Sequence, residues 1–185
     1  MKKGGAGRQF TPFGIMVVIL LVATAIALWL AYLPWRWEQT KDKLRKRYPS
    51  INRLDTDGLA EWLGRKGGPK PVLIDVRTAA EFEYSHLPGA KRMDRDDTPA
   101  SFGVPANTEE SLVICDAIGA DAHPVADSLV KRGYAYARVQ VLEGGVFEWA
   151  NRGRQLVGPD GKTGKVLTGN PDLLPLLKRR VRANP

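Results

Sequence analysis

Cys115, the one cysteine of this 185-residue chain, stands where a thiol could act as a nucleophile. It follows Leu112–Ile114, an apolar run typical of a buried strand, and precedes a short loop that leads into a helical segment. Such a turn directs backbone N–H groups into a concave nest, and the helix N-terminus adds positive potential. Both effects lower a thiol pKa, and the N–H groups can hold an anion or a second sulfur. The pattern is compatible with nucleophilic sulfur chemistry and also with a purely structural cysteine.

The loop after the cysteine is acidic. Asp116 and Asp121 lie within it, and no Lys or Arg occurs between Cys115 and Ser128. Carboxylates so close to a thiolate raise its pKa and repel dianions. The composition of the loop therefore opposes the activation that its predicted shape would provide.

Other polar residues fall near the remaining predicted strand ends. We expect Arg77 and Glu81 to form an ion pair that holds the loops, and Asp75 to hydrogen-bond loop backbone. His86 could carry a proton near the site or make a structural hydrogen bond. His123 begins the helix after the cysteine loop, and we expect it to face solvent. We assign structural, supporting roles to Asp75, Arg77, Glu81 and His86.

The elements that position these residues alternate between short strands and helices. Strands are predicted at 72–74, 112–114 and 137–142, and helices at 55–63, 78–84, 125–132 and 146–151. Thr78 followed by Glu81 has the spacing of a capping box. This alternation predicts an α/β fold of parallel βαβ units with a sheet covered on both faces. Ligands of such sheets bind outside the carboxyl ends of the strands, which is where Cys115 falls.

Several motifs resemble those of the rhodanese-like domain. The first half of that domain is similar to Leu73-Ile74-Asp75-Val76-Arg77, Glu81-Phe82 and His86-Leu87-Pro88-Gly89-Ala90. The second half is similar to Cys115, the helix to Gly133-Tyr134, Leu142-Glu143-Gly144-Gly145, Trp149 and Gly153. The order and spacing of these motifs fit across residues 50–157, which we take as the domain.

The resemblance implies a fold and a chemistry. The fold is a central parallel five-stranded sheet flanked by helices, with the active-site loop after the fourth strand. Cys115 would accept sulfane sulfur as a persulfide and pass it to a thiophilic acceptor. The implied sulfur-binding loop is Asp116, Ala117, Ile118, Gly119, Ala120 and Asp121, with the backbone of 116–120 as the cradle. The implied partners are a sulfane-sulfur donor and a small-molecule or protein thiol, and neither a cofactor nor a metal is expected.

The loop departs from the family pattern in two ways. Family sulfurtransferases commonly have a six-residue loop that ends in Arg, whereas this loop is one residue longer and offers Asp121. Phosphatase relatives have the longer loop but need the Arg to bind phosphate, so its absence argues against phosphatase activity. Two hypotheses remain: a sulfurtransferase or persulfide carrier, and a catalytically weak or inactive binding or regulatory module.

The N-terminal part of the chain predicts a membrane anchor. No charged residue occurs from Gln9 to Trp35, and Ile15–Leu33 is an apolar run of 19 residues. A helix of that length is about 28 Å long, close to the roughly 30 Å hydrocarbon core. We predict a transmembrane helix at 13–35 after a basic tail at 1–12. A cleaved signal peptide is the alternative, although its apolar region would be shorter.

Basic residues flank the predicted domain on both sides. The linker at 36–49 and the tail at 158–185 are basic, and we expect both to contact anionic lipids. Six basic side chains follow the apolar run and three precede it, which favours a cytoplasmic domain. We therefore expect a single-pass protein of a bacterial inner (plasma) membrane. No nucleic-acid motif accompanies the +8 net charge, and nothing indicates the oligomeric state.

The tail contains two further structural signals. Gly158-Pro159-Asp160-Gly161 is a turn sequence, which predicts a small hairpin through residues 165–167. Residues 173–182 could form a short amphipathic helix, which would pack on the domain or lie on the membrane.

Overall fold

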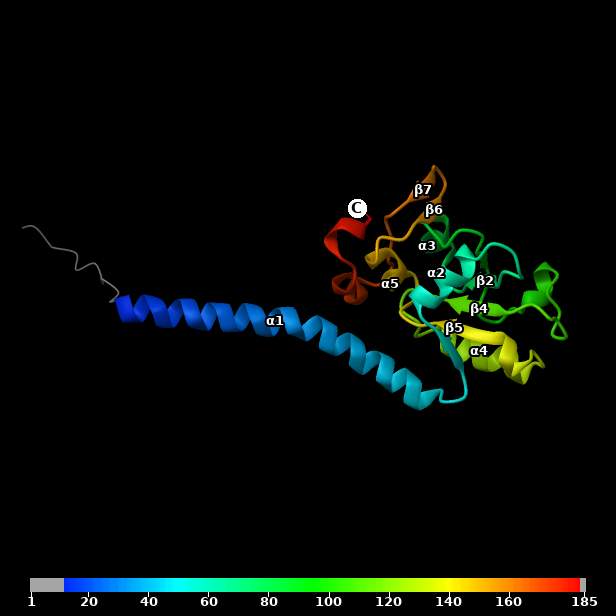
Figure 1. Cartoon of the computed structure of the whole chain (residues 1–185), viewed down its shortest axis with the longest axis horizontal. Helices are drawn as coiled ribbons and strands as arrows, with labels where there is room; N and C mark the ends of the chain where they lie inside the picture. Colours follow the sequence, from blue (N-terminus) through cyan, green and yellow to red (C-terminus); the bar gives the residue numbers. More distant parts are fainter. Residues whose placement is uncertain (1–11, 184–185) are drawn as a thin grey trace, which may run out of the picture. The chain divides into compact units, whose positions relative to one another are not determined.

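The computed structural model describes residues 12–183 (Figure 1). Within the first helix, the side chains of five residues lie outside the described residues: Trp29, Leu30, Leu33, Pro34 and Arg36. The chain divides into two compact units, Met1–Gln39 and Thr40–Pro185. The second unit holds the sheet and all residues predicted to do chemistry.

Helix α1 runs over Pro12–Arg47, so the linker predicted at 36–49 is helical as far as Arg47. The described apolar side chains of its first half are exposed: Ile19, Leu20 and Leu21, for example, are 63%, 66% and 64% exposed. Among the residues whose structure is described, no helix combines the length and apolar composition needed to cross a membrane. The transmembrane helix at 13–35 therefore stays a prediction.

The main sheet has five parallel strands in the order β1-β5-β4-β2-β3. The strands are β1 (Asn52–Leu54), β2 (Val72–Asp75), β3 (Lys91–Arg92), β4 (Leu112–Cys115) and β5 (Val139–Leu142). All four residues of β4, the central strand, are buried, because it is covered on both faces. The predicted α/β fold with a parallel five-stranded sheet is confirmed, and the cysteine ends the fourth strand along the chain.

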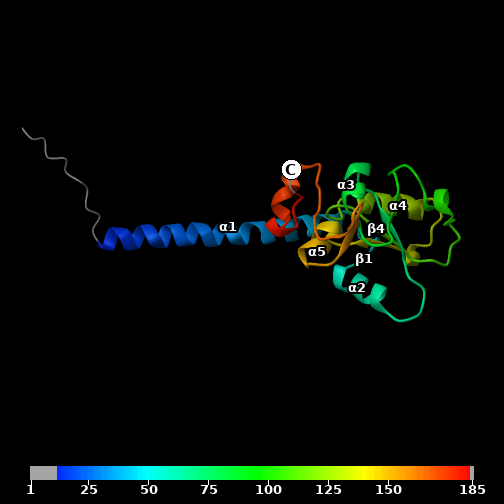
Figure 2. The same ribbon diagram turned by 90° about the horizontal axis from the view of Figure 1, so that it is seen from above.

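Four short helices cover the sheet. They are α2 (Thr56–Gly64), α3 (Ala79–Tyr84), α4 (Ala122–Lys131) and α5 (Gly145–Asn151). Helix α4 lies on one side of the sheet and α2 on the other in both views (Figures 1 and 2). On the α4 side, Leu112 and Ile114 of β4 pack with Val125 and Leu129 of α4 in one core cluster. This packing fixes the loop between β4 and α4, which carries the candidate site.

The tail packs on the domain in a form that differs from the prediction. The predicted turn joins β6 (Leu156–Gly158) to β7 (Gly161–Thr163), so the second strand lies before residues 165–167. The helix predicted at 173–182 is wrong: two 3₁₀ turns, η3 (Pro171–Leu176) and η4 (Arg179–Val181), take its place. Pro175 lies inside the segment and lacks the N–H that a regular helix needs. Leu177 and Val181 are nevertheless buried.

Candidate active site

Cys115 lies at the carboxyl end of β4, at the base of the loop 116–121. It pairs in register with Asp75, the last residue of β2, and its carbonyl accepts a hydrogen bond from the N–H of Val76 (2.9 Å). The residue is only 1% exposed. Burial raises the pKa of the Cys115 thiol well above its ordinary value, and the charges of Asp75 and Asp116 raise it further while Arg77 lowers it. Cys115 is therefore a buried thiol whose thiolate form is disfavoured.

The carboxylate of Asp116 organises the loop that follows. One of its oxygens accepts hydrogen bonds from the backbone N–H groups of Ile118 (3.0 Å) and Gly119. The other oxygen accepts hydrogen bonds from the N–H groups of Asp121 (2.5 Å) and Ala122 (3.3 Å). Four successive or nearly successive N–H groups thus point at one buried carboxylate, as they would in an anion-binding nest.

The Asp116 carboxylate binds backbone groups that were predicted to hold the transferred sulfur. The backbone of 116–120 was expected to hold the transferred sulfur, yet the N–H groups of Ile118 and Gly119 already bind Asp116. These two N–H groups of the predicted cradle therefore have an anionic partner from the loop itself. Asp116 was predicted as a charge that disfavours the thiolate and as a member of the sulfur-binding loop, and its hydrogen bonds to the loop backbone were not predicted.

Asp116 is itself electrostatically unusual. It is 3% exposed, and burial raises the pKa of its carboxyl group to about 6, although the backbone hydrogen bonds of Asp121 and Gly119 oppose the increase. Since no arginine or lysine pairs with it among the described residues, backbone dipoles alone stabilise its negative charge. The charge next to Cys115 therefore depends on pH in the mildly acidic range.

Two glycines bring α5 against the loop. Gly144 and Gly145 have φ values of +83° and +57°, a region that favours glycine. The N–H groups of Val146 and Phe147 then donate to the carbonyls of Asp116 (2.9 Å) and Ala117 (3.0 Å). A Cβ at Gly145 would lie 2.7 Å from the carbonyl carbon of Ala117, so only glycine allows this approach. The loop is held from both its N–H and its C=O groups.

Asp75 and Arg77 form a buried ion pair at the end of β2. The Arg77 guanidinium donates to both carboxylate oxygens of Asp75, with Nη2 at 2.6 Å, and also to the carbonyl of Ser85 (2.7 Å). Burial alone would lower the pKa of Arg77, but the bonds and charge of Asp75 outweigh it and raise that pKa. The predicted pair of Arg77 with Glu81 is wrong, because the guanidinium of Arg77 pairs with Asp75 instead.

Glu81 and His86 have structural roles. Glu81 closes the predicted capping box with Thr78 at the start of α3, and also accepts the N–H of Gly169 in the tail (3.1 Å). His86 stacks on Phe82, and its Nδ1 makes a 2.8 Å hydrogen bond with the carbonyl of that residue. For His86 the structural alternative of the two predictions is therefore the one observed.

His123 is buried, so the expectation that it faces solvent is wrong. It is 2% exposed, and its Nδ1 lies 2.5 Å from the carbonyl oxygen of Gly119, to which it must donate a proton. Burial lowers the pKa of His123. The neutral ring leaves Nε2 as a buried acceptor without a partner among the described residues. Nothing in the sequence indicated that the side chain of His123, on the first turn of α4, would be buried against the carbonyl of Gly119.

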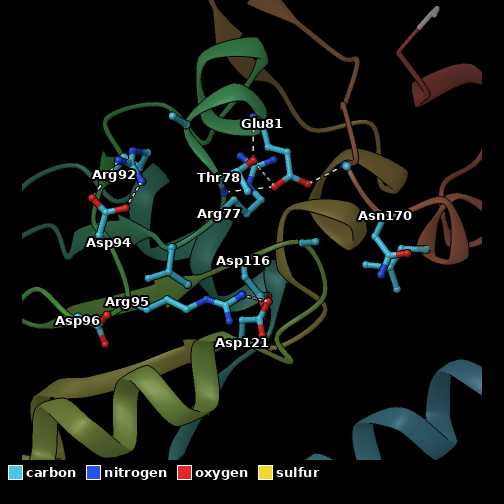
Figure 3. A pocket seen from close by; sticks show the side chains of 15 residues that line it. Arg77, Thr78, Glu81, Arg92, Asp94, Arg95, Asp96, Asp116, Asp121 and Asn170 are labelled. Carbon is cyan, nitrogen blue, oxygen red and sulfur yellow. Dashed lines mark hydrogen bonds and ion pairs between the residues drawn. The ribbon is translucent and has the colours of Figure 1, made fainter.

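A cleft of about 800 Å³ opens above the loop (Figure 3). Asp116 and Ala117 line it, whereas Cys115 is not among its lining residues. Arg95 reaches across from the segment after β3 and pairs with Asp121 at 2.5 Å, as Figure 3 shows. The other side chains that line it include Arg77, Thr78, Glu81, Arg92, Asp94, Asp96, Asn170 and Leu173. Within the described part of the chain, no cluster of His, Cys, Asp and Glu could hold a metal ion.

A parallel five-stranded sheet with a cysteine loop after its fourth strand defines a rhodanese-like fold. A family model of the rhodanese-like domain matches residues 58–152, just over half of the chain, which therefore belongs to this family. A protein of Allochromatium vinosum named Sulfurtransferase is 27% identical over 111 residues, covering 60% of this chain and 99% of that protein.

Two solved structures share the fold. The BH2092 protein from Bacillus halodurans has a TM-score of 0.53 and 20% identity, and the match covers 75% of this chain and 97% of that chain. The thiosulfate sulfurtransferase from Pseudomonas aeruginosa has a TM-score of 0.54 and 18% identity over 72% of this chain and 25% of that one. At such identities the likeness shows the fold alone.

Proposed function

We propose that the chain is a rhodanese-type sulfurtransferase or persulfide carrier in which Cys115 is the nucleophile. The observation that carries this proposal is the position of Cys115 at the carboxyl end of β4, at the base of a loop that borders a cleft. Membership of the rhodanese-like family and the relative named Sulfurtransferase support it.

The chemistry begins with attack on sulfane sulfur. The Cys115 thiolate forms a bond to the outer sulfur of the donor, and the donor fragment leaves with the electron pair of the broken bond. Cys115 is buried and its pKa is raised, so the donor must reach a thiol whose thiolate form is disfavoured at rest. A thiophilic acceptor then removes the outer sulfur and regenerates the thiol.

The direct test is mass spectrometry of the full chain after exposure to several sulfane-sulfur donors. We expect the peptide containing Cys115 to gain the mass of one sulfur atom and to lose it on treatment with cyanide. Cys115→Ser is the control, and it should show neither change. Absence of a persulfide with every donor would reject the proposal.

The second candidate function is a rhodanese-like binding or regulatory module with little or no catalysis. It is favoured by the carboxylate of Asp116, which occupies loop N–H groups, and by the raised pKa of the buried Cys115 thiol. Under this alternative, Cys115→Ser would leave the cellular phenotype of the protein unchanged. Under the first, the substitution would reproduce the phenotype of a deletion.

We also propose that the N-terminal segment anchors the protein in a membrane, with the domain in the cytoplasm and basic residues at the lipid surface. The uncharged run from Gln9 to Trp35 and the exposure of its described apolar side chains support an anchor. The protein should resist extraction of membranes by alkaline carbonate. In intact cells, a membrane-impermeant thiol reagent should fail to label Cys115 even after mild denaturation of surface proteins.

A further inference from the structure

Every arginine that lines the cleft is engaged by a carboxylate. Arg92 binds Asp94 through two hydrogen bonds of 2.7 and 3.1 Å, and Arg95 binds Asp121 at 2.5 Å. The third, Arg77, is bound by the buried aspartate two residues before it. An anion that enters the cleft therefore meets guanidinium groups whose charge is already compensated.

Additional carboxylates line the cleft without such partners. In the described part of the chain, no ion pair reaches the side chains of Glu81, Asp96 or Asp116. Together with the two paired aspartates, five carboxylates therefore face three guanidinium groups. The cleft thus has two more carboxylates than guanidinium groups, and this excess of negative charge favours cations over anions.

The loop offers an anion little compensation. Its N–H groups at Ile118 and Gly119 bind the Asp116 carboxylate, as do those of Asp121 and Ala122. One guanidinium nitrogen, Nη1 of Arg77, has no partner among the described residues, but it is buried away from solvent. Four loop N–H groups that could bind an anionic sulfur compound are thus occupied by a carboxylate, and the one unpartnered guanidinium nitrogen is covered.

From these contacts we infer that the cleft selects a sulfur acceptor whose thiol lies next to a positive charge. This inference rests on the proposed function and names the class of its acceptor. The acceptor thiolate attacks the outer sulfur of the Cys115 persulfide and forms a new S–S bond. The bond between the two persulfide sulfurs breaks, its electron pair leaves with Cys115, and a proton restores the thiol. The acceptor becomes a persulfide, so no external oxidant or reductant is needed.

The test uses three thiols that differ only in their charged end: cysteamine, 2-mercaptoethanol and 2-mercaptoethanesulfonate. The full chain, in nonionic detergent, is loaded with polysulfide sulfur and freed of excess donor, and loss of the persulfide is followed by mass spectrometry. Asp94→Asn with Asp121→Asn reduces the number of carboxylates in the cleft from five to three. Glu109→Gln is the matched control, because Glu109 forms a similar exposed pair with Arg138 at 2.5 Å but does not line the cleft.

Each rate is expressed relative to the same thiol with the control variant, which cancels the intrinsic reactivity of the thiols. At low salt we expect the double variant to reduce the preference for cysteamine over the sulfonate by about tenfold. At about 1 M salt, where the screening length is about 3 Å, the two proteins should behave alike. An unchanged preference in the double variant at low salt, both with these thiols and with the charged cysteine peptides described below, would overturn the inference.

Two further comparisons distinguish failure of the proposed function from failure of this inference, and a protein acceptor from a low-molecular-weight acceptor. If Cys115 takes up no sulfur, the proposed function fails and this inference fails with it, whereas loading without a charge preference overturns the inference alone. Peptides with cysteine between two lysines or two glutamates form a second arm. A lysine preference restricted to peptides supports a protein thiol as the acceptor, and one shared with the small thiols supports a low-molecular-weight acceptor.

Discussion

Two buried aspartates stand at the ends of neighbouring parallel strands, and they are stabilised in different ways. Asp75 ends β2 and has the guanidinium of Arg77 on both of its oxygens. Asp116 follows β4 and has four backbone N–H groups but no cationic side chain within the described residues. Asp75 is fully buried, and Asp116 is 3% exposed.

The difference shows that hydrogen bonds and charge compensation are separate requirements. Both carboxylates have their lone pairs satisfied, so neither carries the cost of an unmade hydrogen bond. Only Asp75 also has a compensating charge, whereas burial raises the pKa of Asp116 to about 6. Asp75 is therefore paired with a cationic side chain, whereas Asp116 carries a charge that mild acid can remove from the side of Cys115.

Breaking the charge-compensated pair should have the largest effect. Arg77→Met leaves the carboxylate of Asp75 buried without a counter-charge, and we expect the free energy of unfolding to fall by about 3–5 kcal/mol. Urea unfolding of the full chain, followed by circular dichroism at pH 7, measures the loss. Adding Asp75→Asn to the same chain removes the buried charge and should recover part of the stability.

The control for this prediction is Arg138→Met. Arg138 forms an ion pair of 2.5 Å with Glu109, but its side chain is 40% exposed and that of Glu109 is 89% exposed. Water screens this pair, so its loss should cost less than about 1 kcal/mol. Equal losses in the two arginine variants would show that burial does not distinguish them.

The second prediction concerns the pH dependence of stability at Asp116. The pKa of Asp116 in the folded protein is about 6, which lies above the ordinary value of 3.8. The stability that arises from this difference is fully present below pH 3.8 and is lost as the pH rises through 6. The loss is on the order of 3 kcal/mol between pH 4 and pH 7. Over the same pH interval, the free energy of unfolding of Asp116→Asn should rise by about that amount relative to that of the wild-type protein.

The measurement is the difference in unfolding free energy between the two proteins at several pH values. The amide of Asn presents an N–H₂ group to loop N–H donors, which adds a cost that does not vary with pH. Only the change of this free-energy difference with pH is therefore informative. A slope of zero between pH 4 and pH 7 would mean that the pKa of Asp116 is not raised by folding.

Sequence patterns predicted the scaffold of the site better than its interior. The apolar run Leu112–Ile114 and the capping box at Thr78 located β4 and α3, because each depends on local periodicity or spacing. The rhodanese-like motifs predicted the family. The partner of Arg77 and the burial of His123 were predicted incorrectly, since they depend on how side chains turn after the strands have paired.

The role of Asp116 shows why the rest could not be read from sequence. An aspartate beside a cysteine predicts electrostatic repulsion, and that effect is present in the raised pKa of Cys115. Its hydrogen bonds to Gly119 and Ala122 require a loop path that brings residues three and six positions away onto one carboxylate. A short Asx turn has a sequence signature, but a complete nest closed on its own side chain does not.

The third prediction tests whether the charge of Asp116 affects Cys115. Because Asp116 raises the pKa of the thiol, Asp116→Asn should increase the rate of alkylation by iodoacetamide severalfold at pH 8. Cys115 is the one cysteine of the chain, so mass spectrometry of the intact protein reports its modification directly. Asp160→Asn is the control, because Asp160 is an exposed turn residue in the β6–β7 hairpin.

Alkylation of the wild-type protein should also be slow at pH 7.5 and should accelerate above pH 9. The direction follows from burial, which is the largest contribution to the raised pKa of the Cys115 thiol. Rapid labelling at neutral pH that saturates below pH 8 would contradict both the burial and the charge argument. Cys115→Ser should take up no reagent.

The smallest effect is expected at a third aspartate, Asp121, whose carboxylate pairs with Arg95 at the rim of the cleft. The two side chains are 49% and 60% exposed, so solvent screens the pair and each long side chain loses rotamer freedom in forming it. We expect Arg95→Gln to change the free energy of unfolding by less than about 1 kcal/mol, in contrast to Arg77→Met. The same urea titration measures both, and a loss at Arg95 as large as that at Arg77 would show that the rim pair holds the loop as firmly as the buried pair holds β2.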